Sequence, residues 1–194
     1  RTLADRLKER YRFNRKPDWR WFEPAVTYSN GVIPWGMLWA YEATGDKETL
    51  QIALESLNFL IDLTITAEGR FRPVGNRGWC TPGRRAIWDQ QPIEALKMTL
   101  ALTKAYELTG RALYRAHAET CRNWFLGEND GEILMINPSE GSCYDGLGPG
   151  GANLNQGAEY TLAYQLTEVL FEKMVESDGK TGRVLDEENV MFSS

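Results

Sequence analysis

The chain has 194 residues, of which 42% are hydrophobic, so it can bury a sizeable core, and its length favours a single domain over residues 1–194. Its 22 basic and 27 acidic residues are scattered and leave a net charge of -5, which excludes a basic stripe for nucleic acid. No run of about 18 apolar residues and no signal-type apolar core are present, so we expect a cytoplasmic protein with no membrane contact.

The residues needed for metal or nucleophile chemistry are scarce. Cys80, Cys121 and Cys143 are widely spaced and form no CxxC pair, and the sequence contains a single histidine, His117. This set does not supply a structural zinc site, a disulfide framework or a serine or cysteine triad. The glycine-rich stretch 146–151 also lacks the pattern of a phosphate-binding loop. We therefore expect neither a metal nor a cofactor.

The first predicted element is an amphipathic helix over residues 3–13. Leu3, Leu7 and Tyr11 recur there at helical spacing, and the positions between them are mostly charged. We interpret this segment as an outer helix whose inner partner is absent.

Two helix–turn–helix units follow, and they are related in sequence. Residues 40–60 align with residues 105–125, with matching Ala, Tyr, Glu, Thr and Gly positions. Gly45 and Gly110 in the two copies can adopt the left-handed conformation that ends a helix. Each copy is therefore predicted to be a helical hairpin that turns at its glycine.

The two helices of each hairpin differ in composition. The first is rich in large apolar and small residues, as expected of an inner helix buried on most sides, whereas the second alternates apolar and charged positions like an outer layer. The inner helices are predicted at about 32–44 and 92–109, and the outer helices at about 47–63 and 111–126.

A third inner helix is predicted at residues 158–176, followed by a short extended tail at 180–192, while residues 69–80 and 131–138 resemble short β segments in long loops. Helical hairpins with long loops at one end favour an all-α fold, an α/α toroid or a partial arc of one. A ring of six hairpins would need roughly twice this length. We therefore expect a fragment or shortened form of a larger toroid, or a homo-oligomer.

The long loops before the three inner helices carry aromatic rings beside amides and carboxylates. A ring stacks on the apolar face of a sugar, and the polar groups bond its hydroxyls, although such rings can also simply close hairpin ends. If the hairpins run in parallel order, the three loops meet at one end and form a carbohydrate site. The candidate substrate-binding residues are Trp21, Glu23, Tyr28, Asn30, Trp79, Trp88, Gln90, Gln91 and Asn155.

Three carboxylates in these loops are candidate catalytic residues, because glycoside hydrolysis usually needs two carboxyl groups beside the scissile bond. Asp89, between a tryptophan and a glutamine, is expected in a partly dry setting that suits a general acid or base. Glu159 lies in the first turn of its helix, where the helix dipole favours the ionised form, and Asp145 is the third candidate. The structural alternatives are capping for Glu159 and turn formation for Asp145, and we interpret Glu94 mainly as a helix cap.

The runs WFEP, TYSN, VGNRGW, DQQPIEA and NLNQGAEYTLA, within residues 19–171, resemble the helical-hairpin module of the six-hairpin glycosidase superfamily, in the form associated with bacterial glycosyltransferases. The resemblance implies an α/α toroid and a role in glycan metabolism, with an oligosaccharide or glycan as substrate and a glycosyltransferase as a partner. In the first motif Ser29 stands where an acid is expected, which shifts the catalytic role to Asp89, Asp145 and Glu159.

The sequence thus predicts a glycosidase-like hydrolase that cleaves glycosidic bonds, or processes glycans in a related way, with paired carboxylates. Two other functions fit the same residues. One is a non-catalytic glycan-binding or accessory domain of a glycosyltransferase system, which binds without releasing product. The other is an α-solenoid that binds protein, in which the carboxylates do not converge.

Overall fold

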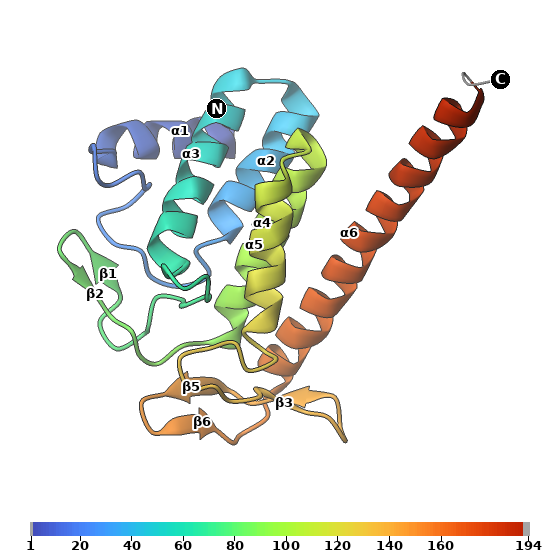
Figure 1. The fold of residues 1–194 in the computed structure, drawn as a ribbon. Coiled ribbons are helices and arrows are strands. Elements are labelled where there is room, and N and C mark those ends of the chain that lie inside the picture. Colours follow the sequence, from blue (N-terminus) through green and yellow to red (C-terminus); the bar gives the residue numbers. More distant parts are fainter. Residues whose placement is uncertain (1, 192–194) are drawn as a thin grey trace.

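The computed structural model describes the backbone of residues 2–191 and the side chains of residues 2–177. Over this part of the chain it contains six helices and three two-stranded antiparallel sheets (Figure 1). The helices are α1 (Leu3–Asn14), α2 (Val32–Thr44), α3 (Lys47–Thr64), α4 (Pro92–Thr109), α5 (Ala112–Asn123) and α6 (Ala158–Met191). The paired strands are β1 (Cys80–Thr81) with β2 (Arg84–Arg85), β3 (Ile136–Asn137) with β4 (Ser142–Cys143), and β5 (Gly146–Gly148) with β6 (Gly151–Asn153).

This architecture shows that the predicted all-α toroid is wrong. Helices α2 to α5 stand side by side, but the described helices do not close a ring, and the long connections fold into small sheets below them (Figure 1). The connections do so because they are rich in glycine, asparagine and proline, which favour tight turns over helix. The molecule is therefore a mixed structure in which a helical body rests on a layer of hairpins.

Helix α6 corrects a second prediction. It runs for 34 residues to Met191 and leaves the helical body (Figure 1), so residues 180–191 are helical rather than extended, and residue 192 lies outside the described residues. Glycine lowers helix stability by only about 1 kcal/mol, and no proline interrupts this run. Neither α6 nor any other helix in the described part of the chain is long and apolar enough to cross a membrane.

The turns between paired helices follow from particular residues. Gly45 and Gly110 both adopt the left-handed conformation, with φ of 71° and 65°, and each donates its N–H to the carbonyl of a tyrosine one turn earlier. Asp46 then begins α3, because its carboxylate accepts the backbone N–H of Glu48 at 3.1 Å. The helix ends predicted at these glycines from the sequence repeat are therefore confirmed in both copies.

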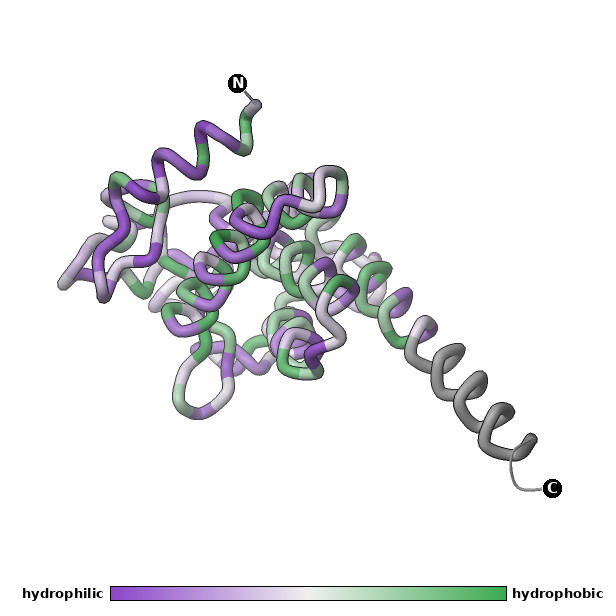
Figure 2. Tube along the Cα trace, turned by 90° about the horizontal axis from the view of Figure 1, so that it is seen from above, coloured by the Kyte–Doolittle hydropathy of each residue, from purple (hydrophilic) through white to green (hydrophobic). Residues whose placement is uncertain are grey.

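The hydrophobic core lies between the helices and extends into the loops beneath them. Met37 of α2, Leu57 of α3 and Leu102 of α4 are fully buried. Trp21 and Trp124, both from loops, are also buried, so aromatic rings close the end of the helical body. Figure 2 shows that hydrophobic residues gather on the central helices, whereas the peripheral α1 is largely hydrophilic.

Gly31, at the start of α2, marks a close approach to α4. A Cβ added there would lie 2.2 Å from the carbonyl oxygen of Lys97. We predict that Gly31→Ala lowers the free energy of unfolding by about 1–3 kcal/mol, because the backbone of α2 must move away from α4. Urea unfolding followed by circular dichroism measures this change.

The control is Gly36→Ala, within the same helix, where an added Cβ meets no heavy atom within 4 Å. This variant should raise stability by about 0.5–1 kcal/mol, because alanine favours helix over glycine. Equal unfolding midpoints for the two variants would contradict the predicted close contact.

Candidate functional site

The loops that precede α2, α4 and α6 meet at one end of the helical body. All three helices begin at the lower end of the molecule in Figure 1. Backbone bridges join Val26 to Cys80 and Gln90 to Leu147, and each bridge connects two of these loops. The convergence that the sequence predicted is therefore confirmed.

Glu94, in the first turn of α4, holds the loop before α2. Its buried carboxylate accepts the backbone N–H of Ser29, the backbone N–H of Asn30 at 3.3 Å and the side-chain amide of Asn30 at 3.2 Å. Burial raises the pKa of Glu94 to about 7, although these donors act in the opposite direction. Glu94 thus connects the start of α4 to the loop before α2, which corrects its interpretation as a cap of its own helix.

The side chain of Asn30 also forms hydrogen bonds within its own loop, beside Glu94. Its amide also donates to the carbonyl of Thr27 at 2.9 Å, and its oxygen accepts the Thr27 backbone N–H at 3.0 Å. The residue is 6% exposed. Asn30 therefore shapes the loop, and its role as a sugar ligand stays a prediction.

Gln90 joins the other two loops. Its backbone N–H and carbonyl pair with Leu147, both at 2.9 Å. Its side-chain nitrogen donates to Asp130 at 2.6 Å, and its side-chain oxygen accepts the indole N–H of Trp124 at 2.9 Å. Gln90 is fully buried and both polar side-chain atoms are engaged, so its side chain serves this junction, and its role as a sugar ligand stays a prediction.

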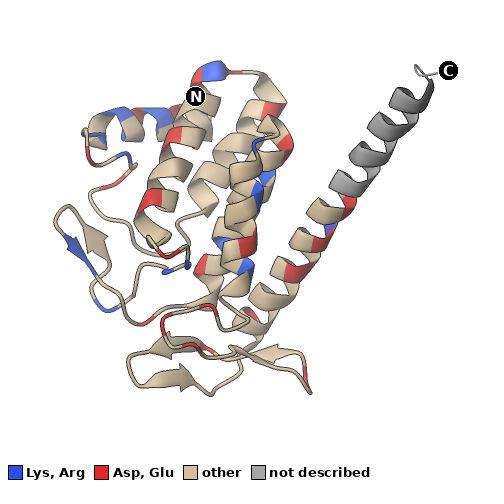
Figure 3. Ribbon diagram, viewed as in Figure 1, with Lys and Arg blue, Asp and Glu red and all other residues tan. Residues whose placement is uncertain are grey.

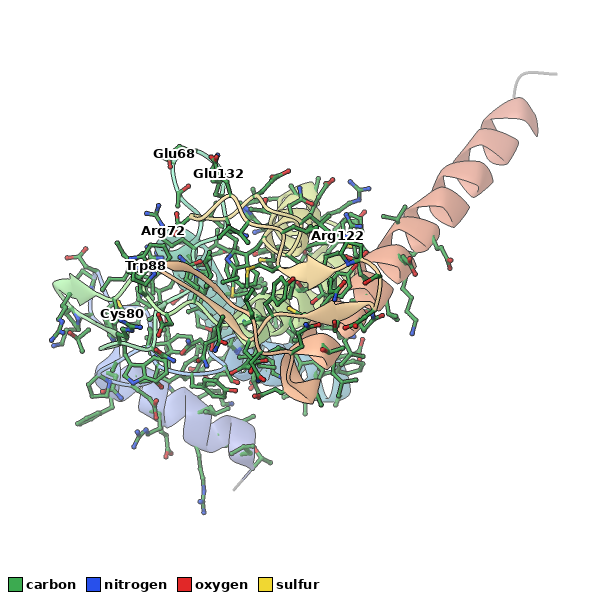
Figure 4. All side chains as sticks on the ribbon, turned by 90° about the horizontal axis from the view of Figure 1, so that it is seen from below. Glu68, Arg72, Cys80, Trp88, Arg122 and Glu132 are labelled. Atoms are coloured by element: carbon green, nitrogen blue, oxygen red, sulfur yellow. The ribbon has the colours of Figure 1, made fainter. Side chains whose placement is uncertain are left out.

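Asp130, which accepts the side-chain hydrogen bond of Gln90, also forms an ion pair with Arg72. The Arg72 guanidinium donates to both oxygens of Asp130, with Nε–Oδ2 at 2.7 Å and Nη2–Oδ1 at 2.6 Å. Burial pushes the pKa of Asp130 upward, but hydrogen bonds from Arg72 and Gln90 hold it below its usual value. Figure 4 shows Arg72 and Trp88 among the side chains of this loop layer.

A cleft of about 500 Å³ lies over the junction, a volume typical of small-molecule sites. The β5–β6 hairpin forms much of its wall, together with the loop before α4 and the first turn of α6. Its lining residues are Asn76, Arg77, Asp89, Gln90, Gln91, Asp145, Gly146, Gly148, Pro149, Gly150, Gly151, Ala152, Asn153 and Tyr160.

Asp89 is the carboxylate of the cleft with an unused oxygen. Its Oδ2 accepts from Arg77 Nε at 2.9 Å, whereas its Oδ1 is buried and has no hydrogen-bond partner among the described residues. A Cβ added at Gly148 would lie only 3.0 Å from Oδ1, so glycine lets the β5–β6 hairpin approach the carboxylate closely. A buried acceptor without a donor costs free energy, which a ligand hydroxyl can recover.

Asp145, the second carboxylate of the cleft, is engaged by its own loop. Its Oδ1 accepts the backbone N–H of Gly157 at 2.6 Å, and its Oδ2 accepts the side-chain amide of Asn155. Asn155 itself does not line the cleft. The structure thus places Asn155, a predicted sugar ligand, against Asp145 and outside the cleft lining.

Gln91 and Tyr160 form a polar and aromatic part of the wall, with Gln91 Nε2 donating to the Tyr160 hydroxyl at 2.9 Å. Burial raises the pKa of this tyrosine. The sequence predicted Gln91 as a ligand but missed Tyr160, Asn76 and Arg77. Signals for them were present, because Tyr160 follows Glu159 in NQGAEY and the other two lie in VGNRGW.

The predicted aromatic platforms do not line the cleft. Trp21 is 1% exposed and packs edge-on against Phe22 with ring centroids 5.3 Å apart, so its ring is part of the core. Trp79 and Trp88 are half-buried against the core, and Tyr28 is exposed but outside the cleft lining. Rings in loops that meet over helix ends gain more by sealing the core than by facing solvent.

Two predicted acids also lie outside the cleft lining. Glu23 is 3.5 Å from Arg10 of α1, on a surface formed by the N-terminal helix. Glu159 is exposed and accepts the hydroxyl of Tyr28 at 2.7 Å, so it ties α6 to the loop before α2. The cleft thus unites Asp89 with Asp145, and Glu159 is not brought to them.

In comparisons with known proteins, no family model and no curated protein matches this chain. Its function has to be inferred from the side chains of the cleft themselves.

The raised pKa of Glu94 predicts a pH dependence of stability. The folded-state pKa of about 7 exceeds the ordinary value of 4.5, so the stabilising contribution is complete below pH 4.5 and is lost as the pH rises through about 7. One pKa unit corresponds to about 1.4 kcal/mol, so the loss amounts to about 3 kcal/mol. Urea unfolding at a series of pH values measures it.

Glu94→Gln removes the titrating group and serves as the comparison. The variant should be less stable at low pH, because the amide satisfies fewer backbone donors, but its stability should fall less as the pH rises. Parallel pH profiles for the two proteins would rule out Glu94 as the source.

Proposed function

We propose that the cleft binds a carbohydrate and that the protein is a glycan-processing enzyme of the glycosidase type, with Asp89 as its principal catalytic carboxylate. One observation carries this proposal: separate loops bring Asp89 and Asp145 to one polar cleft, and Asp89 Oδ1 has no hydrogen-bond partner among the described residues. Paired carboxylates in a cleft are the groups that glycoside hydrolysis uses.

The other groups of the cleft suit a polyhydroxylated ligand. Asn76, Asn153 and Gln91 offer amide donors and acceptors for hydroxyls, and Tyr160 supplies an aromatic ring. The glycines of the β5–β6 hairpin allow a ligand to approach the backbone closely. A sugar hydroxyl that donates to Asp89 Oδ1 supplies the missing hydrogen bond.

The two carboxylates differ in the roles that their contacts allow. Asp89 takes the role of general base or nucleophile, and its ion pair with Arg77 fixes the orientation of its side chain. Asp145 is the second carboxyl group, and in the acid role it exchanges its hydrogen bond from Asn155 for one to the glycosidic oxygen. Arg77 and Asn155 are thus positioning residues.

The sequence resemblance to the glycosidase-like module associated with bacterial glycosyltransferases supports the same substrate class. The runs VGNRGW, DQQPIEA and NQGAEY that carry this resemblance also supply Arg77, Asp89, Gln91 and Tyr160 to the cleft. An oligosaccharide is the proposed substrate, and a glycosyltransferase system is the proposed context.

A second function is favoured by the engagement of Asp145. Because both of its oxygens accept hydrogen bonds within the loop, the cleft also suits a non-catalytic glycan-binding domain that positions an acceptor for a glycosyltransferase. This alternative keeps Asp89 and Gln91 as ligands for hydroxyls and predicts saturable binding without release of product.

A glycan-array screen combined with reducing-sugar detection identifies a ligand and separates binding from cleavage. For a glycan that the protein cleaves, we predict that Asp89→Asn lowers the rate of cleavage by about 10²–10⁴-fold, the usual contribution of a general acid or base. The unfolding midpoint should be unchanged. Glu119→Gln, on the exposed surface of α5, is the matched control and should retain full activity.

An unchanged rate of glycan cleavage in Asp89→Asn would exclude Asp89 as the catalytic carboxylate. Saturable binding without product release in the unmodified protein would replace the enzyme with the glycan-binding domain.

A further inference from the structure

A second cleft, of about 730 Å³, lies among the turn after α1, the C-terminal half of α3 and the β1–β2 hairpin. It shares no lining residue with the proposed carbohydrate site. The residues that matter for its chemistry are Lys16, Trp19, Phe59, Leu63, Arg84 and Arg85.

Apolar side chains line one part of this cleft. Trp19 and Phe59 pack edge to face with ring centroids 5.2 Å apart, and both are largely buried, at 5% and 7% exposure. Leu63, one helical turn beyond Phe59, is half-buried beside them. Such a surface favours a flat apolar group, because ring faces and edges pack well against it.

Cationic side chains surround these apolar groups. Lys16, Arg84 and Arg85 line the cleft with a single acid, Asp18. Lys16 and Arg84 are exposed and form no ion pair with any carboxylate in the described part of the chain. Figure 3 shows β2, which consists of Arg84 and Arg85, as a basic strand at the outer edge of its hairpin. The cleft is therefore positively charged.

Arg85 adds an unsatisfied donor. Its Nη2 donates to the carbonyl of Arg72, but its Nε is buried and has no hydrogen-bond partner among the described residues. A buried N–H without an acceptor costs free energy, and a guanidinium is best satisfied by a carboxylate or phosphate. The cleft thus combines apolar side chains with one guanidinium, that of Arg85, whose Nε has no acceptor among the described residues.

We propose that this second cleft binds a small aromatic anion, with its ring against Trp19, Phe59 and Leu63 and its carboxylate or phosphate beside Arg84 and Arg85. The charge of the cleft selects the anion, and the rings select a flat apolar group. The positive charge is not needed for a neutral oligosaccharide, and the two clefts share no lining residue, so this site is independent of the proposed carbohydrate cleft.

Phenyl phosphate and benzoate are the test ligands, with phenol as the neutral ring and inorganic phosphate as the anion without a ring. Binding is followed by two-dimensional NMR through the indole N–H of Trp19, which donates to the carbonyl of Glu23 at 2.7 Å and is assigned with Trp19→Phe. We expect a saturable shift with at least one aromatic anion, at least about tenfold tighter than with phenol or inorganic phosphate.

The double variant Lys16→Gln, Arg84→Gln tests the charge requirement without altering a buried side chain, since both residues are exposed. It should weaken binding of the aromatic anion by at least about tenfold, whereas Arg111→Gln, an exposed control at the start of α5, should leave it unchanged. Equal affinity for phenol and phenyl phosphate, full affinity in the double variant, or no saturable shift with either aromatic anion would overturn the proposal. A preference for phosphate over carboxylate, or the reverse, identifies the acid group.

Discussion

The hydrogen bonds of one buried glutamine, Gln90, hold together segments that are distant in sequence. Its backbone pairs with Leu147, and its side chain bridges Trp124 and Asp130, whose carboxylate is in turn bound by Arg72. Buried polar groups are stable only when their partners are all in place, so these contacts form together or not at all. The neighbours of Gln90 in sequence, Asp89 and Gln91, owe their positions in the cleft to this junction.

The carboxylates of the loop layer differ in whether both of their oxygens have hydrogen-bond partners within the protein. Glu94, Asp130 and Asp145 each accept hydrogen bonds with both carboxylate oxygens. Glu94 and Asp130 connect segments distant in sequence, whereas Asp145 orders its own loop. Asp89 differs, because one oxygen has no partner in the described part of the chain. A fold tolerates such a local deficit when the surroundings are fixed by other contacts, and deficits of this kind concentrate where ligands bind.

Local features of the sequence predicted the helices well and their assembly poorly. Gly45 and Gly110 end helices through their own backbone conformation, which a short stretch of sequence reveals. The contacts of Glu94 and Gln90 were not predicted because their partners lie 65 and 40 residues away, at Ser29 and Asp130. The repeated hairpins predicted a ring because hydrophobic periodicity shows which face of each helix is buried. It carries no information on the fold of the long loops between the helices. The cleft was found because its carboxylates lie in loops that precede parallel helices.

The tip of the β5–β6 hairpin, Pro149 and Gly150, is exposed while the base of the hairpin is bonded to Gln90. An added side chain at Gly150 meets no atom within 4 Å. Natural variation at this tip therefore alters the mouth of the cleft without disturbing the residues that fold it. Loop tips of this kind tolerate substitution and insertion, so the shape of the cleft mouth can change independently of Asp89 and of the contacts that hold Gln90.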